Sequence, residues 1–539
     1  RMTGRWLRRT LGGALALVAL VLIVLWLGLR ASLPTLDGEI VVAGIDDVVT
    51  IARDADGIPV ITASNRYDLA YATGYAHGQD RFFQMDLIRR KAAGELSELV
   101  GAAAINADRR YRFHRFRARA AAVFEAATEA DRRLMQSYAA GVNAGLNSLS
   151  AKPFEYFVLG SEPRAWNALD SLLAVYAMYM DLNDSRATKE IRRGMAHSVL
   201  PPEVYSWMYP QGTSWDAPIM GAPLEVPPIP SADVYSIRDV PDDAPPANEQ
   251  GRYPLRGSNN WAVSGALTAN GRALVANDMH LGHRVPNIWY QARVRVPGPE
   301  GRDVTGVTLP GSPFVISGSN TQVAWGYTNS YGDWTDAVVL RPGATEGTYQ
   351  TPEGDREFVA YVETINVKGG DPVKYEIRET IWGPVIDDVD YPAGEVVVSW
   401  IAHKPEGINL NLLKLERARS VAEALDIANT MSMPPQNFVT GDAGGNIGWT
   451  IAGQIPRKSG FDPMLPADWS VEHGWQGWLA PSEYPRVVNP DSGRIWTANA
   501  RVVDAATLRI VGDGGYDLGA RSGQIRDGLL AMDSFTPDD

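Results

Sequence analysis

The sequence contains no cysteine among its 539 residues. Disulfide bonds, thiolate nucleophiles and zinc–thiolate sites are therefore excluded, and the fold has to be stabilised by packing. The sequence also lacks an excess of positive charge. It has 50 Lys and Arg against 63 Asp and Glu, which gives a formal net charge of −13. Nucleic-acid backbones are bound by clustered Lys and Arg, so we expect no nucleic-acid partner. Ser, Thr and Lys are the nucleophile types left to test.

Several standard catalytic motifs are missing as well. No serine lies in the GxSxG pattern of an α/β-hydrolase, the seven histidines form no HExxH motif, and no GxxxxGK[ST] loop occurs. These absences argue against an α/β-hydrolase, a zinc protease of that class and a P-loop enzyme. The sequence also shows no internal repeat of fixed period.

A long apolar stretch lies near the N-terminus. Residues 11–29 contain no charged side chain, and at ~1.5 Å per residue they span roughly 28 Å, about the thickness of a bilayer core. Four arginines precede this stretch and acidic residues follow it, which places residues 31 onward outside the cytoplasm. We expect residues 1–32 to be a single-pass signal-anchor at the periplasmic face of the inner membrane. A cleaved signal peptide that leaves a soluble periplasmic protein is the alternative.

The rest of the chain divides into regions by its patterns. Residues 33–222 are expected to be mostly helical. Residues 51–61 predict a strand, a Gly turn and a second strand. Asp68 can then cap a long helix, because apolar side chains recur at helical spacing over 69–100. Residues 223–257 are rich in Pro and acidic residues and predict an exposed spacer that is cut or removed on maturation. Residues 258–539 show period-two alternation and predict a strand-rich region.

Several runs of residues resemble the penicillin acylase family. YAHGQDRFFQMD at 75–86 and RRKAAGEL at 89–96 look like the start of the helical chain of these enzymes. GSNNWAV at 257–263 looks like the start of their strand-rich chain, and PQNF at 435–438 with GNIG at 445–448 is similar to a later run. The runs follow the family order over about residues 45–535, so the sequence is identified as a member. Family members usually continue past the point that matches its last residue, and we expect both ends of the natural protein to extend further.

The resemblance implies a fold and a maturation step. The fold is α+β, a four-layer αββα sandwich of the N-terminal-nucleophile hydrolases, made of an α-chain and a β-chain cut from one precursor. The Ser258 hydroxyl would attack the carbonyl of Gly257, and hydrolysis of the ester would leave Ser258 with a free α-amine. An α-amine has an ordinary pKa of about 7.7 to 8.0, which suits a general base near neutral pH. Gly257 fits this role because it has no Cβ to obstruct the attack.

The implied activity is hydrolysis of a linear amide C–N bond through an acyl-Ser258 intermediate. The small-molecule substrate would be an N-acyl-homoserine lactone, an acylated peptide or a β-lactam with an amide side chain. His280 matches the family position that orients the Ser258 amine, and its identity resembles lactone, lipopeptide (aculeacin-type) and cephalosporin acylases. The backbone N–H of Asn329 and the side-chain amide of Asn437 match the donors to the oxyanion. The alternative is a processed but catalytically inactive, membrane-anchored binding protein.

The resemblance also implies an acyl pocket and a metal site. The pocket would be lined by Met178, Leu182, Leu281 and Phe314, each of which could equally be ordinary core, with Arg457 orienting the region of Asn437.

Asp333 and Asp336 alternate around the carbonyl of Thr335, a spacing that suits calcium, and Glu190 would complete a structural Ca²⁺ site across the two chains. Two solvated loop carboxylates are the other interpretation. A metal at the HxxH pair of His280 and His283 is not expected, because no third ligand lies nearby. No organic cofactor is expected.

Overall fold

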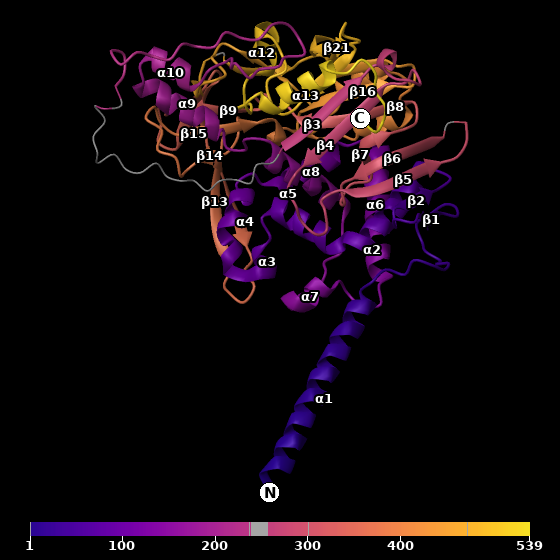
Figure 1. Cartoon of the computed structure of the whole chain (residues 1–539). Coiled ribbons are helices and arrows are strands. Elements are labelled where there is room, and N and C mark those ends of the chain that lie inside the picture. The colour runs from indigo at the N-terminus through magenta and orange to yellow at the C-terminus, as the bar shows by residue number, and fades with distance from the viewer. Residues whose placement is uncertain (1, 237, 239–256, 300, 472) are drawn as a thin grey trace.

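The computed structural model describes residues 2–236, 238, 257–299, 301–471 and 473–539. Helix α1 (Met2–Ala31) extends away from the rest of the molecule (Figure 1). Its segment Arg8–Ala31 is long and apolar enough to cross a membrane, and none of that apolar surface is buried by the protein. A signal sequence has the same properties, so the structure leaves the choice between anchor and signal peptide open.

The longest helix of the folded part is α2 (Arg66–Ala93). Asn65 caps its N-terminus by accepting hydrogen bonds from the next backbone N–H groups, and Gly94 ends it with a φ of 65°. The predicted cap, Asp68, is therefore corrected. Asp68 lies in the first turn, and its carboxylate accepts the backbone N–H groups of Asp46 and Asp47 at 2.9 and 3.1 Å.

Helix α2 packs closely against α6 (Glu129–Asn147). Glycines on both helices make the approach possible, because a Cβ on Gly74 or Gly141 would overlap backbone atoms of the opposite helix. The other helices of this region surround the pair: α3 (Ser97–Val100), α4 (Ile105–Arg112), α5 (Phe116–Ala126), α7 (Phe154–Leu159), α8 (Ala168–Leu182), α9 (Thr188–Val199) and α10 (Pro202–Met208).

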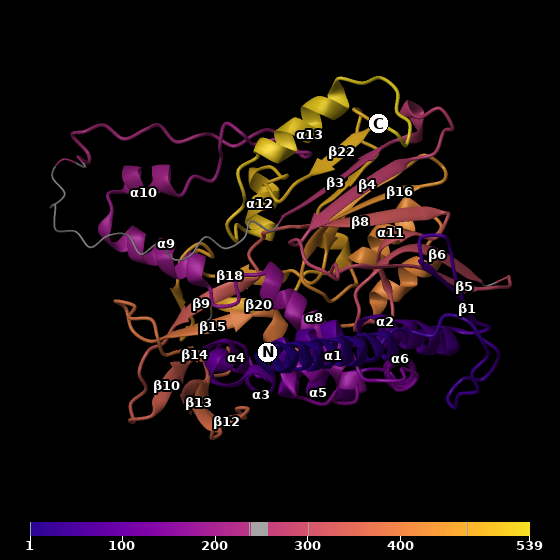
Figure 2. The ribbon, with the colours of Figure 1, turned by 60° about the horizontal axis from the view of Figure 1, so that its bottom comes forward.

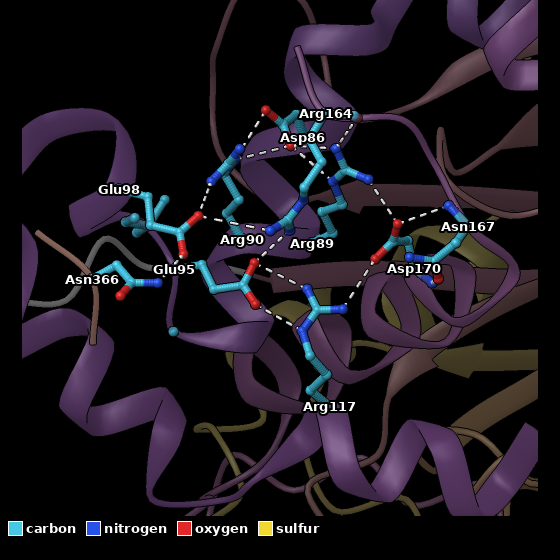
Figure 3. A network of polar contacts seen from close by, with 12 residues as sticks. Asp86, Arg89, Arg90, Glu95, Glu98, Arg117, Arg164, Asn167, Asp170 and Asn366 are labelled. Atoms are coloured by element: carbon cyan, nitrogen blue, oxygen red, sulfur yellow. Dashed lines mark hydrogen bonds and ion pairs between the residues drawn. The ribbon is translucent and has the colours of Figure 1, made fainter. Parts of the chain in front are cut away.

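A buried network of charges ties these helices together (Figure 3). Arg89 is fully buried and binds the carboxylates of Asp86 and Asp170, each at 2.7 Å. Arg90 also binds Asp86, and two further arginines bind Glu95. The network draws on the YAHGQDRFFQMD and RRKAAGEL runs, so those sequence runs encode the core of the helical region.

The largest sheet has nine strands among the described residues, in the order β1-β2-β5-β6-β7-β8-β16-β17-β21. Strands β1 and β2 form the hairpin predicted at 51–61. The strands are β1 (Thr50–Arg53), β2 (Pro59–Thr62), β5 (Tyr290–Val296), β6 (Arg302–Thr308), β7 (Val315–Ser319), β8 (Val323–Asn329), β16 (Gln436–Asp442), β17 (Ile447–Ala452) and β21 (Arg486–Val488).

Two further sheets complete the strand-rich region. One has the order β22 (Arg494–Thr497), β3 (Gly257–Val263), β4 (Leu274–His280), and the other has β14 (Val385–Ile386), β15 (Val396–Trp400), β9 (Thr335–Val339), β19 (Ala467–Asp468). Three hairpins flank them: β10 (Thr348–Thr351) with β11 (Gly354–Glu357), β12 (Val359–Ile365) with β13 (Val373–Glu379), and β18 (Pro456–Ser459) with β20 (Gly474–Trp478).

The three-stranded sheet packs on one face of the nine-stranded sheet. Strands β3 and β4 contact β8 and β16, and Gly326 allows this because a Cβ there would press on Asn260 and Asn277. On the opposite face of β8, Trp325 and Tyr327 pack with α2 and with α11 (Val421–Ala428). Helix α13 (Ala520–Leu530) contacts β22, and α12 (Ala505–Val511) lies nearby (Figure 2). The predicted α+β class is confirmed.

Candidate active site

Ser258 is the second residue of β3 and lies beside an apolar cavity. Pairing with β4 fixes its strand position, and its exposed fraction is only 4%. The cavity holds about 870 Å³, including the part open to solvent. Ser258 contributes to its wall, and no charged side chain does so within the described part of the chain. A hydroxyl at the edge of such a cavity can face the carbonyl of an apolar acyl group.

The structure places the four apolar residues predicted for the acyl pocket around this cavity. Met178 and Leu182 come from α8, whereas Leu281 and Phe314 come from the strand-rich region. Helical and strand-rich regions therefore share the wall. Arg457 is not among the lining residues; it is exposed and pairs with Glu483 at 2.5 Å.

Two hydrogen-bond donors meet at the Ser258 hydroxyl. The backbone N–H of Asn329, at the end of β8, donates to Ser258 Oγ over 3.1 Å. The side-chain amide of Asn499 donates to the same oxygen over 3.3 Å. The carbonyl oxygen of that amide accepts the backbone N–H of Ser258 at 2.7 Å. Asn499 thus contacts both the hydroxyl and the nitrogen of Ser258, and the sequence analysis missed it.

Arg521 on α13 holds Asn499 in this orientation. Its guanidinium donates to Asn499 Oδ1 at 2.8 Å and to the Ser258 carbonyl oxygen at 3.0 Å. Since a guanidinium only donates, the oxygen of the Asn499 amide must face it, which leaves Nδ2 facing Ser258 Oγ. Asn499 has a φ of 61°, a conformation that Asn adopts more readily than most residues and that often occurs at functional sites.

Asn437 lies elsewhere, which corrects its expected place beside Ser258. It is on β16, and its side-chain oxygen accepts the indole N–H of Trp449 at 3.0 Å. Neighbouring residues of a strand point to opposite faces, and it is Gln436, not Asn437, that lines the cavity. The Asn437 amide nitrogen is buried without a hydrogen-bond partner among the described residues. A single matched run could not show on which face Asn437 points.

His280 lies opposite Gly257 in the β3–β4 pair. A Cβ on Gly257 would lie 2.4 Å from His280 Nε2 and 3.1 Å from Arg521 Nη2, so a larger residue here would displace the His280 ring. His280 Nδ1 is 3.1 Å from the carboxylate of Asp278, which can orient the imidazole. The histidine therefore stands next to the Gly257–Ser258 bond.

The residues predicted for calcium gather at the junction of α9 and β9. Glu190 is on α9, Asp333 precedes β9, and Thr335 and Asp336 are its first two residues. Lys458 on β18 lies among them, with Nζ 2.6 Å from Asp333 and 2.8 Å from Asp336.

No group of three His, Asp or Glu side chains within the described ranges is arranged to hold a metal. The donor set therefore does not fit a dication while the lysine ammonium stands between the aspartates.

Comparison with known proteins gives the same family as the sequence runs. The sequence profile described as Penicillin amidase matches residues 48–539. The chain belongs to the penicillin amidase family. The penicillin acylase 2 proenzyme of Pseudomonas sp. (strain SE83) is 32% identical over 88% of this chain and 61% of its own length. The acyl-homoserine lactone acylase QuiP of Pseudomonas fluorescens (strain Pf0-1) is 26% identical, again over 88% of this chain, and over 58% of its own length.

A member of the penicillin amidase family with a solved structure also matches in part. The thermostable penicillin G acylase from Alcaligenes faecalis has a TM-score of 0.46 at 23% identity, covering 52% of this chain and 50% of that one. The chain thus spans about three fifths of the length of the curated relatives named above.

Proposed function

We propose that this chain carries the nucleophile of a self-processing amide hydrolase that cleaves an acyl group from a linear amide. The observation that carries this proposal is the convergence of the Asn329 N–H and the Asn499 amide on Ser258 Oγ at the edge of an apolar cavity. When Ser258 Oγ bonds to a carbonyl carbon, the oxyanion forms next to Oγ, where donors beside Oγ can stabilise its charge. Membership of the penicillin amidase family supports the same reaction class.

The first reaction is cleavage of the chain itself. Ser258 Oγ bonds to the carbonyl carbon of Gly257, the C–N bond breaks, and the Ser258 nitrogen gains the proton that Oγ loses. Water then hydrolyses the ester and leaves a carboxylate on Gly257. His280 beside Gly257 is positioned to assist this proton transfer, and Asn499 Oδ1 already holds the nitrogen that becomes the α-amine.

The second reaction uses the amine thus formed. The Ser258 α-amine takes the proton from Oγ as this oxygen bonds to the substrate carbonyl carbon, and the proton passes to the leaving amine. Water hydrolyses the acyl-Ser258 ester to release the carboxylic acid. Asn329 N–H and Asn499 Nδ2 stabilise the oxyanion in both steps, and Arg521 is a positioning residue that acts through Asn499.

The acyl group is uncharged and apolar in this proposal. The cavity wall consists of aliphatic, aromatic, thioether and neutral polar side chains, so a carboxylated acyl chain would lose its hydration without gaining a partner. The names of the relatives mention penicillin and acyl-homoserine lactone, and both compounds can carry an apolar acyl group on an amide.

Architecture and location are part of the same proposal. We propose that α13, the three-stranded sheet, the nine-stranded sheet and the helices α2 and α11 form the four layers of an N-terminal-nucleophile hydrolase. We further propose that α1 anchors the enzyme and that the catalytic part lies in the periplasm, because four arginines precede the apolar stretch. Residues 239–256 of the predicted spacer lie outside the described residues.

Mass spectrometry of the full-length protein tests the proposal. The wild type should yield two chains, the second beginning with Ser258, and Ser258→Ala should yield one uncut, inactive chain. Ser258→Cys is the matched variant, since a thiol can still attack Gly257 and should permit some cleavage. A Ser258→Ala protein that is cut at the same bond, or that hydrolyses acyl amides, would contradict the mechanism. A cut wild type with no turnover on a panel of apolar acyl amides would favour the inactive binding protein.

A pair of asparagine variants tests the choice of oxyanion donor. Asn499→Ala should lower kcat by about 10²–10³-fold, the usual effect of losing one such donor. Asn437→Ala should lower it far less, because Asn437 contacts Trp449 instead of Ser258. The opposite ranking would favour Asn437 as the donor. Activity has to be compared at equal extents of chain cleavage, since the same donors serve both reactions.

A further inference from the structure

The junction between α9 and β9 contains more buried carboxylates than it has cations in contact with them. Asp336 is fully buried, and Glu190 and Asp333 are each 6% exposed. Glu190 is far in the sequence from Asp333 and Asp336, and it lies on the helical side of the predicted cleavage site. Three carboxylates in so small a volume repel one another unless a cation or protons are present.

Lys458 supplies a cation from the chain itself. Its side chain is only 14% exposed, and its Nζ lies 2.6 Å from Asp333 Oδ2 and 2.8 Å from Asp336 Oδ2. Contacts with both aspartates at once place the ammonium between them, where a dication bound by the same two oxygens would have to lie. A bound calcium and the ammonium would therefore compete for the same oxygens.

Two further donors reach the carboxylates, whereas Glu190 Oε1 and Asp336 Oδ1 have no hydrogen-bond partner among the described residues. The indole N–H of Trp475 donates to Asp336 Oδ2 at 2.6 Å, and the backbone N–H of Ala337 donates to Glu190 Oε2 at 2.9 Å. Calcium takes six to eight oxygen ligands, and donors of the chain already occupy one oxygen of each of the three carboxylates. Arg193, three residues after Glu190, is held by Asp513 and adds positive charge nearby.

We infer that the Lys458 ammonium takes the place of a divalent metal at this junction, so that the buried carboxylates have a counterion from the chain and need no bound calcium. The lysine is a structural counterion in this assignment. The assignment stands whether or not the chain is cut before Ser258, because Lys458, Asp333 and Glu190 meet in the uncut chain.

The wild-type protein gives the first test. The full-length protein, stripped with EDTA and dialysed, should show the same Tm with and without 1 mM CaCl₂. Tb³⁺ is a second probe, since Trp475 donates to Asp336 and would sensitise the luminescence of a lanthanide bound there. No saturable luminescence is expected at micromolar Tb³⁺. One bound Ca²⁺ per chain together with a rise in Tm of several degrees would overturn the assignment.

The second test removes the lysine. Lys458→Met should lower Tm by roughly 5 °C or more, because breaking a buried ion pair leaves charges unpaired. Added Ca²⁺ should restore much of this loss and should now give Tb³⁺ luminescence, because the variant keeps the three carboxylates. Lys414→Met is the control, as Lys414 is exposed and should change neither readout.

The two tests support one another if the variant does not fold. Recovery of soluble Lys458→Met protein only when Ca²⁺ is present during expression would support the assignment. Failure in both conditions leaves the decision to the wild-type measurements, which need no variant. A Lys458→Met protein with wild-type Tm in EDTA would contradict it, because the carboxylates would then not depend on the lysine.

Discussion

The molecule contains two buried clusters of charged side chains, and they differ in how many cations accompany their carboxylates. In the helical region, four carboxylates and four arginines form the network of Figure 3. At the junction of α9 and β9, three carboxylates share one lysine. Asp86, Asp170 and Glu95 are about as buried as the three junction carboxylates, so the number of opposite charges decides how these carboxylates behave.

The pKa values of the carboxylates show the difference. Burial would raise the pKa of Glu95, but the hydrogen bond and charge of Arg117, together with Arg164, lower it below the ordinary value. At the junction, burial raises the pKa of Asp333 to about 7 against the opposing effect of Lys458. Burial and the neighbouring aspartates raise the pKa of Glu190 well above its usual range. Matched charges keep buried acids ionised, whereas an excess of acid retains protons.

The largest expected effect comes from breaking the balanced network. Arg89→Met should destabilise the protein by about 3–5 kcal/mol, because Asp86 and Asp170 would stay buried without their shared partner. Urea unfolding, or soluble yield if the variant does not fold, measures the loss. Arg89→Lys should recover only part of the stability, since one ammonium cannot reproduce a guanidinium that binds two carboxylates. A variant as stable as the wild type would mean that the network does not hold the helices.

The second prediction concerns the pH dependence at the junction. Because the pKa of Asp333 is higher in the folded state, the folded protein binds more protons than the unfolded chain between about pH 4 and 7. The free energy of unfolding should therefore fall as pH rises through this window, by up to about 1.4 kcal/mol per pH unit. Asp333→Asn should flatten this slope in urea titrations at pH 5 and 7. An unchanged slope would show that Asp333 is ionised throughout.

The third prediction is the opposite dependence in the helical region. Glu95 has a lowered pKa in the folded state, so its contribution is present above the ordinary glutamate pKa and is lost as pH falls through the folded value. Glu95→Gln should cost about 1 kcal/mol at pH 7 and little at pH 3. If both variants showed the same pH trend, the comparison between the clusters would fail.

The smallest effect is expected where a pair is exposed to solvent. Arg341 binds Asp468 at 2.7 Å, but the Arg341 side chain is 58% exposed. Arg341→Gln should change the free energy of unfolding by less than about 1 kcal/mol, and the change should shrink further in 0.5 M NaCl. A larger loss would indicate that pairing itself, and not burial, determines the cost of removing an arginine.

Much of the fold follows from local patterns in the sequence. The apolar helix at residues 11–29, the hairpin at 51–61 and the strand pattern after Ser258 each appear in the structure close to the predicted positions. The helix expected over 69–100 ends earlier, because Gly94 adopts a left-handed conformation and closes it. Such patterns are readable because each depends on neighbours within one turn or one strand.

The candidate site could be predicted only in part, because some of its contacts join segments that are distant along the chain. Ser258, Asn329 and the four apolar pocket residues were found from runs of matching sequence, and the structure brings them together. Asn499 and Arg521 lie more than 240 residues beyond Ser258 and carry no local signal of their own. Asn437 has such a signal, but the face on which its strand presents it depends on the pairing of β16 with β8.

By itself, the sequence determined the classes of element, the family and the candidate nucleophile, because these depend on composition, periodicity and short runs. The tertiary structure decided which amide reaches Ser258 Oγ and which cation faces Asp333 and Asp336. Both are contacts between segments distant along the chain, set by strand pairing and sheet stacking. No residue pattern within one segment can specify a partner that only folding brings within hydrogen-bond distance of it.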